Sequence, residues 1–239
     1  MKALTTLGAA IGAALAHDIS FSGGPIYDPA PPLFPLEAKM LGNVALRRRR
    51  EFAWGRHHAH EALRRLGFTP VPILSRSDRA PLWPLGVVGS ISHSSSDCGA
   101  VAGRSRNVLA LGLDIEDEEP LGADLLPIIC TPAELQRREW SSNRLGPKLI
   151  FVIKEAVYKS YSPETGEFLD FQDAGQVTRV GCSRRRSSIQ KNLRVSAVAL
   201  SMEFISRFSE ASLHWRCDFE AGSVALRSLQ SLPGAFAWK

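Results

Sequence analysis

Apolar residues recur at helical spacing in one stretch near the start of this 239-residue chain. Between residues 46 and 66 they form a stripe, which consists of Phe52, Ala59, Ala62, Leu63 and Leu66. Gly67 and Pro70 follow the stripe, as is typical of a helix end. The pattern predicts a helix over 46–66. Gly55 inside it costs about 1 kcal/mol relative to alanine, which indicates that another element approaches closely there.

Short runs of β-branched and apolar residues follow this helix. Residues 87–93 form one such run, and residues 99–103 and 108–116 form two more. The last two runs are separated by the turn-like residues 104–107, which is typical of a hairpin. We therefore expect three strands, with the second and third paired.

A second helical pattern covers residues 147–161, and Pro163 is expected to end it. The segment 18–37 is rich in proline and glycine, which indicates a surface segment. After residue 176 the pattern predicts strands around a basic turn at 183–191. Strands and helices that do not alternate regularly favour an α+β fold class.

The composition, 44% hydrophobic and 22% charged, is that of a soluble globular protein and excludes a disordered or collagen-like chain. The length fits one large domain or two of roughly 100–120 residues each. No uninterrupted run of about 18 apolar residues occurs, so we expect no membrane-spanning helix. The net charge of +5 favours an anionic ligand or partner.

The four cysteines are scattered and form no CxxC pair, which is typical of reduced thiols in a cytoplasmic protein. Residues 1–17 resemble a short signal peptide. However, Lys2 is their only charged residue before Asp18, and polar residues and glycines interrupt the apolar part. We therefore expect a cytoplasmic protein.

Two acidic residues are predicted to share one face of the strand that ends at residue 116. Because side chains alternate along a strand, Asp114 and Glu116 point the same way, about 7 Å apart. Like charges at that distance repel unless a cation lies between them. The alternative is a solvent-facing acidic strand end.

A third acid, Glu155, lies on the second predicted helix and shares a face with Lys159, four residues later. A surface ion pair is the simplest interpretation of those two residues. Together with Asp114 and Glu116, however, Glu155 would complete an oxygen-rich site of the kind that Mg²⁺ prefers. Lys159 would then bind a phosphate oxygen.

Candidate phosphate-binding residues lie in two other places. His93 ends the small-residue run 89–93, although a single histidine is more often structural. The run Arg47 to Arg50, with Arg56 two turns later, offers planar guanidinium groups that match phosphate oxygens. A solvated basic patch is the alternative for part of this run.

Four segments carry a resemblance to a known family, because they occur in its order and at its spacing. They are Arg-Arg-Glu-Phe…Gly-Arg (49–56), Trp83-Pro84…Val88-Gly-Ser-Ile-Ser-His93, Gly112-Leu-Asp-Ile-Glu116, and Phe151-x-x-Lys-Glu-x-x-Tyr-Lys159. Over about residues 40–180 the sequence resembles the 4′-phosphopantetheinyl transferases of the surfactin and enterobactin synthetase type.

The resemblance implies a pseudo-dimer of two similar half-domains with the active site between them. Residues 1–110 would form the side that binds the 3′-phosphate and adenine of coenzyme A, and residues 111–239 the metal and catalytic side. The implied enzyme is of the holo-[acyl-carrier-protein] synthase type. It transfers 4′-phosphopantetheine from coenzyme A to a serine of an acyl carrier protein or peptidyl carrier domain, releases 3′,5′-ADP and depends on Mg²⁺. It would act as a cytoplasmic monomer in siderophore or polyketide biosynthesis, without a nucleic acid or a membrane as partner.

The resemblance also implies residue roles. The Mg²⁺ ligands would be Asp114, Glu116 and Glu155, and Glu155 would help to deprotonate the serine. The pyrophosphate would contact Lys159, with Lys154 nearby. The 3′-phosphate and adenine end would contact Arg48, Arg56 and His93, with Ser92 beside them.

One position departs from the family's pattern. Relatives often carry a lysine after the first helix, where this chain has Ser75. Arg76 or Arg79 would take over that contact.

A basic nucleic-acid-binding protein without catalysis is the alternative from another class, motivated by the arginine clusters at 47–50 and 184–186. It leaves the three acids unexplained, and the sequence contains no binding motif with interleaved aromatic residues. A transferase of narrow scope, serving only fatty acid synthesis, is the closer alternative.

Overall fold

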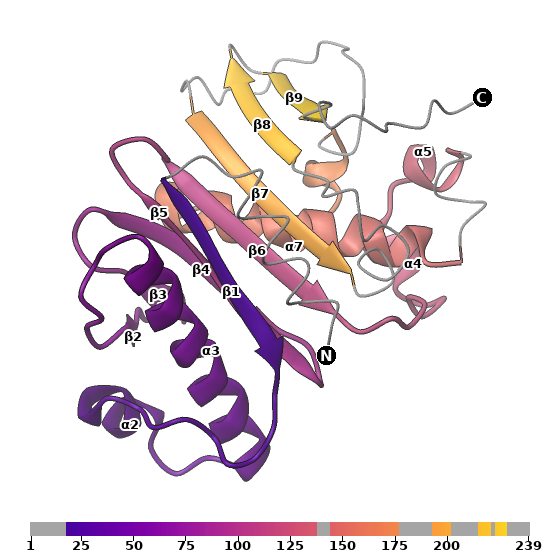
Figure 1. The fold of residues 1–239 in the computed structure, drawn as a ribbon. Helices are drawn as coiled ribbons and strands as arrows, with labels where there is room; N and C mark the ends of the chain where they lie inside the picture. The colour runs from indigo at the N-terminus through magenta and orange to yellow at the C-terminus, as the bar shows by residue number, and fades with distance from the viewer. Residues whose placement is uncertain (1–17, 138–143, 177–192, 202–214, 221–222, 229–239) are drawn as a thin grey trace, which may run out of the picture.

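Two helices of 20 residues, each lying against a β-sheet, organise the fold (Figure 1). The computed structural model describes residues 18–137, 144–176, 193–201, 215–220 and 223–228. In chain order the elements are β1 (Ile19–Pro25), α2 (Pro35–Leu41), α3 (Leu46–Arg65), β2 (Leu74–Ser75), β3 (Pro81–Leu82), β4 (Val87–His93), β5 (Asp97–Arg104), β6 (Ala110–Glu116), α4 (Leu126–Ile129), α5 (Pro132–Leu135), α7 (Gly146–Thr165), η1 (Asp173–Gln176), β7 (Leu193–Ser201), β8 (Trp215–Glu220) and β9 (Ser223–Ser228). This mixture confirms the predicted α+β class.

The first sheet has the order β1-β5-β4, and both of its strand pairs are antiparallel. The expected hairpin between residues 99–103 and 108–116 is therefore wrong. Both edges of β5 are already hydrogen-bonded, to β1 on one side and to β4 on the other. The chain that leaves β5 consequently starts a second sheet with β6.

The segment 18–37 is also more ordered than its composition indicates. It contains β1, whose Phe21 is 2% exposed and belongs to the core. The glycines that suggest a loop lie in the strand ladder, where Gly23 is paired with Gly99 of β5. Pairing with a neighbouring strand therefore outweighs the weak strand propensity of this segment.

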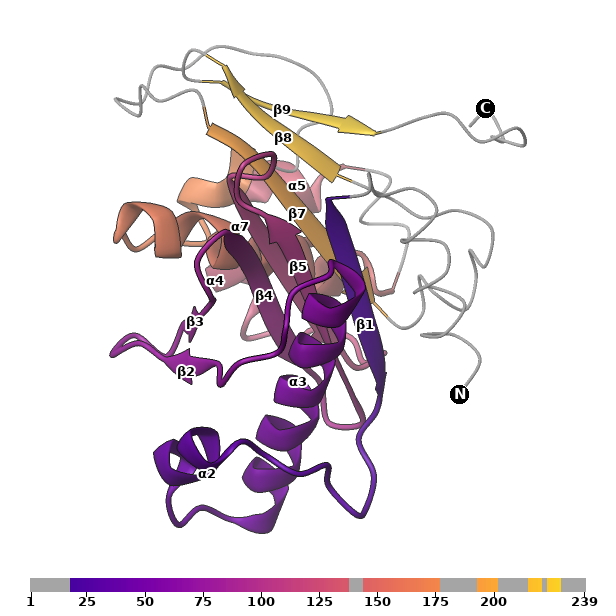
Figure 2. The same ribbon diagram turned by 60° about the vertical axis from the view of Figure 1, so that its left-hand side comes forward.

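Helix α3 covers the first sheet (Figure 2) and confirms the helix predicted over 46–66. Most residues of the predicted stripe lie in a hydrophobic core cluster. The cluster comprises Ala59, Ala62, Leu63, Leu66, Ile73, Val87, Ala100 and Ala102. A Cβ atom at Gly55 would lie 3.0 Å from Ile91 Cγ2 of β4. The glycine thus permits the close approach that the sequence indicates.

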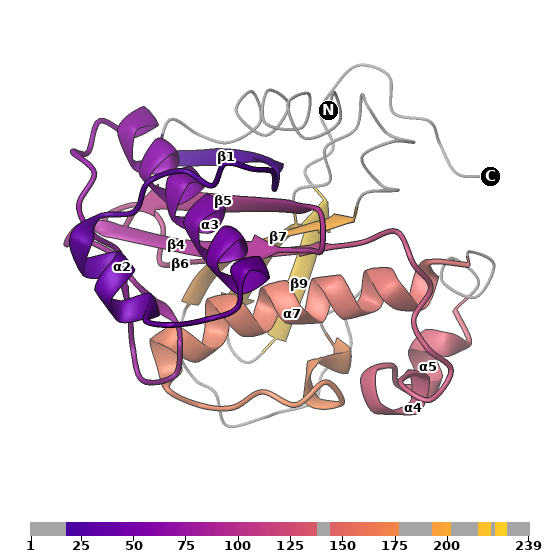
Figure 3. The ribbon, with the colours of Figure 1, turned by 90° about the horizontal axis from the view of Figure 1, so that it is seen from below.

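The second sheet has the order β6-β7-β8-β9, with β6 parallel to β7 and the other pairs antiparallel. Helix α7 runs along β6 and β7 (Figure 3). A Cβ atom at Gly112 of β6 would overlap the carbonyl oxygen of Ala156 in α7. Gly112 therefore lets the helix backbone lie directly on the strand.

The expected end of the second helix at Pro163 is wrong, because α7 continues to Thr165. Proline removes only one backbone N–H here, in the last turn, and the helix ends instead at Gly166 in the left-handed conformation, with φ 71°.

Strands β7 to β9 agree with the strands predicted after residue 176. The start of the chain (1–17) and the basic turn (183–191) lie outside the described residues. In the described part, no helix is long and apolar enough to cross a membrane.

Substituting Gly112 tests the contact between α7 and β6. Gly112→Ala should lower the free energy of unfolding by about 3 kcal/mol, because backbone atoms cannot yield to the added methyl group as a side chain could. Urea denaturation would measure the loss. Gly24→Ala is the matched control, since its Cβ would meet His58 only at ordinary contact distances of 3.6 and 3.7 Å. Equal stability of the two variants would contradict the prediction.

Candidate active site

Three elements meet at the hydroxyl group of Ser92 in β4. The hydroxyl donates to Asp114 Oδ1 of β6 at 3.0 Å, and it accepts from Lys159 Nζ of α7 at 3.1 Å. It also accepts from the backbone N–H of Ile115 at 3.2 Å. One donor and two lone pairs complete the capacity of a hydroxyl. The Ser92 side chain is thus fully used in joining the elements.

Asp114 is a buried carboxylate, with 3% of its surface exposed. Its Oδ1 atom lies 2.5 Å from Lys159 Nζ, which makes Lys159 its counter-ion. Its Oδ2 atom is buried and has no hydrogen-bond partner among the described residues. A buried carboxylate oxygen without a donor is costly, so this atom is available to a ligand that carries positive charge.

Glu116 is held by a lysine that the sequence analysis missed. Lys148 Nζ, at the start of α7, lies 3.0 Å from Glu116 Oε2, and the lysine side chain is only 13% exposed. Lys148 precedes Glu155 by seven residues and Lys159 by eleven, a spacing that places all three on one face of the helix. That spacing is the signal from which Lys148 could have been found.

Glu155 lies between the charges that face it from β6 and α7. Burial raises the pKa of its carboxyl group; the charges of Asp114 and Glu116 raise it further, and only Lys159 lowers it. The net result is a pKa above the ordinary value. The charges of Asp114 and Glu116 thus act on the Glu155 carboxyl group.

The acids suit a hard cation by chemistry, although lysines neutralise two of them in this arrangement. Across residues that the structure describes, no three acidic, histidine or cysteine side chains gather closely enough to hold an ion as they stand. Carboxylate oxygens are nevertheless the ligands that Mg²⁺ prefers, and the unpartnered Asp114 Oδ2 needs a positive ligand. The donor set of Asp114, Glu116 and Glu155 therefore fits Mg²⁺.

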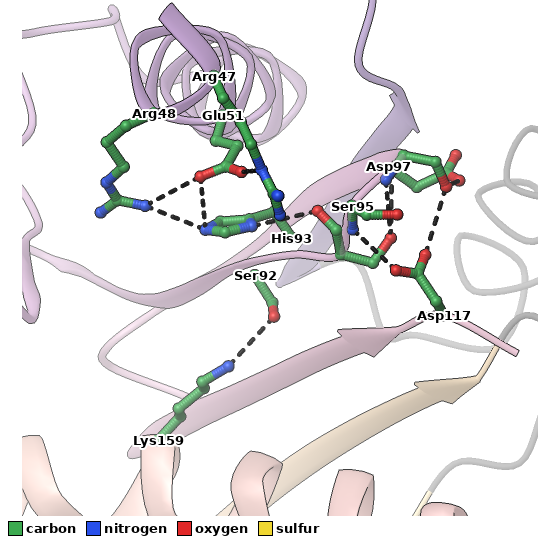
Figure 4. A network of polar contacts seen from close by, with 11 residues as sticks. Arg47, Arg48, Glu51, Ser92, His93, Ser95, Asp97, Asp117 and Lys159 are labelled. Atoms are coloured by element: carbon green, nitrogen blue, oxygen red, sulfur yellow. Dashed lines mark hydrogen bonds and ion pairs between the residues drawn. The ribbon is translucent and has the colours of Figure 1, made fainter. Parts of the chain in front are cut away.

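A second polar cluster joins the start of α3 to the end of β4 (Figure 4). Arg48 Nη1 lies 3.1 Å from His93 Nε2, so two of the predicted coenzyme A residues are in contact. Glu51 lies between them, with its Oε2 atom 3.5 Å from Arg48 Nη1 and 3.8 Å from His93 Nε2. His93 directly follows Ser92, and because side chains alternate along a strand, His93 faces α3 whereas Ser92 faces Asp114 of β6.

Arg56 lies deeper in the protein than Arg48 and is only 6% exposed. Its Nε donates to the Ile73 carbonyl oxygen at 2.7 Å, and its Nη2 donates to Ser75 Oγ at 3.1 Å. The guanidinium lies over the Phe52 ring, 4.3 Å from its centroid, and burial lowers its pKa to about 10. Arg56 therefore contacts Ser75, the residue that stands where relatives often carry a lysine.

Two of the predicted coenzyme A residues make other contacts in the structure. Lys154 is 1% exposed, and its ammonium group donates to the Ile129 carbonyl, Glu134 Oε2 and the Phe171 carbonyl at 2.7–2.8 Å. Because three bonds use all three of its N–H groups, the predicted coenzyme A residue Lys154 has no N–H group left for a ligand in this arrangement and holds α7 against these segments. Arg76 donates to the Pro163 carbonyl oxygen at 3.3 Å, at the far end of α7 from Lys148.

A serine turn connects this region to the end of β6 (Figure 4). The turn between β4 and β5 is closed by Ser94 Oγ, which accepts from the Asp97 backbone N–H at 3.3 Å. Asp117, just after β6, accepts from the Ser95 backbone N–H at 3.0 Å. The end of β6 is thereby fixed to the residues that follow His93.

Comparison with known proteins agrees with this geometry. The model of the 4′-phosphopantetheinyl transferase N-terminal domain matches residues 36–103, and that of the 4′-phosphopantetheinyl transferase superfamily matches residues 110–203. Ser92 thus lies in the first matched region, and its partners Asp114 and Lys159 lie in the second.

Similar proteins include 4′-phosphopantetheinyl transferase Svp of Streptomyces mobaraensis, which is 38% identical over 62% of this chain and 61% of its own length. Enterobactin synthase component D of Salmonella typhi is 38% identical over 51% of this chain and 52% of its own length. The chain therefore spans less than two thirds of each of these two relatives. 4′-Phosphopantetheinyl transferase PptT of Mycobacterium tuberculosis is 35% identical over 71% of this chain and 76% of its own length. Since that match and the two family models extend over most of the chain, it belongs to the 4′-phosphopantetheinyl transferase superfamily.

Proposed function

We propose that this protein transfers 4′-phosphopantetheine from coenzyme A to a serine of an acyl carrier protein or peptidyl carrier domain. The observation that carries the proposal is the junction at Ser92, where Asp114 and Glu116, each held by a lysine, lie on one side of β4 and the Arg48–His93 cluster lies on the other. One side of this junction suits a metal-bound pyrophosphate, and the other suits a phosphate. The names of the relatives support the same reaction.

In the proposed reaction the serine oxygen attacks the phosphorus that carries the pantetheine arm. A new P–O bond to the serine forms, the P–O bond to 3′,5′-ADP breaks, and the nucleotide leaves with the electron pair. Glu155 would accept the serine proton, directly or through a water. Lys159 would contact the pyrophosphate and offset charge on the leaving phosphate.

Asp114, Glu116 and Glu155 would hold Mg²⁺, which would neutralise the pyrophosphate when bound. Lys159 and Lys148 serve as the counter-ions of two of these acids in the structure. Both lysine ammonium groups lie at the same cluster, so either could pass from a carboxylate to a phosphate oxygen by side-chain rotation. Lys148 would therefore bind the pyrophosphate alongside Lys159.

The other end of coenzyme A would lie against α3 and β4. Arg48 and His93 would bind the 3′-phosphate, and Arg56 would contribute from beside Ser75. Arg76 would approach the nucleotide from the β2–β3 hairpin. The boundaries of the two matched family regions, 36–103 and 110–203, support two half-domains that divide near residue 110 and share the active site. The pairing of one long helix with each sheet supports their similarity.

The carrier protein and the cellular setting belong to the same proposal. Carrier proteins of this kind are generally acidic, and a net charge of +5 would attract them. The free, buried thiols of Cys98 and Cys130 support work in the reducing cytoplasm. The protein would act as a monomer, because both halves of the site come from one chain.

Removing the buried acid tests the proposed chemistry. Asp114→Asn should lower the rate of phosphopantetheine transfer by about a hundredfold or more, because it removes an anionic oxygen donor from the proposed Mg²⁺ site and so weakens the neutralisation of the pyrophosphate. Mass spectrometry of an apo-carrier protein would follow the reaction. Asp124→Asn, at an exposed acid after β6, is the control and should leave the rate unchanged. Full activity of Asp114→Asn, or transfer undiminished by excess chelator, would contradict the proposal.

Substituting Lys154 of α7 should mainly lower stability, whereas substituting Lys159 of the same helix should mainly lower activity. Lys154→Met should lower the free energy of unfolding by about 3–5 kcal/mol, because it removes the cation beside the buried Glu134 carboxylate. Lys159→Met should affect stability less, since its side chain is 28% exposed, but it should abolish most of the transfer. Thermal unfolding and the carrier-protein assay, run on both variants with Mg²⁺, would measure this. The prediction fails if Lys154→Met is as stable as the wild type or if Lys159→Met is as active.

A further inference from the structure

Glu51, in the first turns of α3, is a carboxylate surrounded by cationic side chains. Its Oε1 atom accepts from Arg47 Nε at 2.8 Å, and its Oε2 atom faces Arg48 and His93 (Figure 4). Its side chain is 9% exposed, whereas those of Arg47, Arg48 and His93 are 73%, 51% and 35% exposed. The Glu51 carboxylate is therefore buried beneath a cluster of cationic side chains that are open to solvent.

The charge balance of the cluster depends on this acid. Burial alone would raise the pKa of Glu51, but hydrogen bonds from Arg47 and Arg48 and the charges of His93 and Arg47 outweigh it and lower the pKa. Glu51 is consequently ionised at neutral pH. Arg48 and His93, two groups that can both be cationic, lie 3.1 Å apart. A carboxylate in reach of both offsets the repulsion that would otherwise separate them.

The same contacts leave part of Arg48 available. In the described portion of the chain, Arg48 uses only its Nη1 atom, toward Glu51 and His93. Its Nη2 and Nε groups remain for another partner. A planar guanidinium held by one edge presents its other edge in a fixed direction, which is the geometry that binds a phosphate through two parallel hydrogen bonds.

We propose that Glu51 is the positioning residue of the 3′-phosphate site, which holds Arg48 and His93 side by side so that both donate to the phosphate of coenzyme A. The inference rests on the proposed function and adds to it a specificity-determining group. Glu51 does not bind the phosphate itself, because two anions repel each other. It acts through Arg48 and His93, while Arg47 clamps it from the solvent side.

The test compares coenzyme A with dephospho-coenzyme A, which lacks only the 3′-phosphate. Isothermal titration calorimetry in chelator-containing buffer gives the ratio of their dissociation constants without any contribution from metal. Glu51→Gln keeps the size of the side chain and removes its charge. We expect it to reduce the preference for coenzyme A by about tenfold, the loss of one charge-assisted contact, and to leave dephospho-coenzyme A binding unchanged.

Glu61→Gln is the matched control, because Glu61 pairs with Arg64 on the same helix and lies away from His93. Its preference should equal that of the wild type. Arg47→Met provides a second variant, which removes the outer clamp and should reduce the preference in the same direction by a smaller factor. It decides the question if Glu51→Gln does not fold.

The outcomes separate this inference from the function on which it rests. Equal weakening of both ligands in Glu51→Gln would mean that Glu51 only maintains the fold, and an increased preference would mean that it competes with the phosphate. Either result overturns the inference while the wild type still prefers coenzyme A and transfers its arm. A wild-type protein that binds neither ligand would instead overturn the proposed function.

Discussion

The site depends on one buried hydroxyl that joins three elements. Asp114 is only 3% exposed, and the polar contacts of its Oδ1 atom come from Ser92 and Lys159. Ser92 belongs to the first sheet, Asp114 to the second, and Lys159 to the helix that covers the second. The two sheets share no ladder of backbone hydrogen bonds in the described strands, so this polar junction fixes β4 beside β6. Any chemistry at Asp114 therefore requires both parts of the chain.

The charges of α7 and β6 complement each other because the two elements run in opposite directions. Lys148, early in the helix, faces Glu116 at the end of the strand, and Lys159, late in the helix, faces Asp114. Glu155 lies between the two lysines on the same helical face. Three acids can thus be brought together because two ammonium groups offset most of their repulsion. In the proposed reaction a bound cation and a pyrophosphate would replace that balance with another of similar net charge.

Local patterns in the sequence predict local features well. The helix over 46–66 follows from its apolar stripe and Gly67, and the shared face of Asp114 and Glu116 follows from strand alternation. The pairing partners of β5 could not be predicted, because β1 arrives from a glycine-rich segment about 75 residues earlier and occupies one edge. Glu51 and Lys148 were missed for a similar reason, since their importance comes from contacts with β4 and β6 rather than from their neighbours in sequence.

Lys154 shows why adjacency within a motif does not establish a shared role. It directly precedes Glu155, yet one residue along a helix turns the side chain by about 100°. Lys154 therefore points to α4 and α5, where it bonds Ile129 and Glu134, while Glu155 faces β6. The buried ion pair fixes the rotation of α7 about its own axis, and Gly112 fixes its distance from the strand. Both constraints act on the one helix that supplies Glu155 and Lys159, so the motif combines a residue that orients the helix with residues that would perform the chemistry.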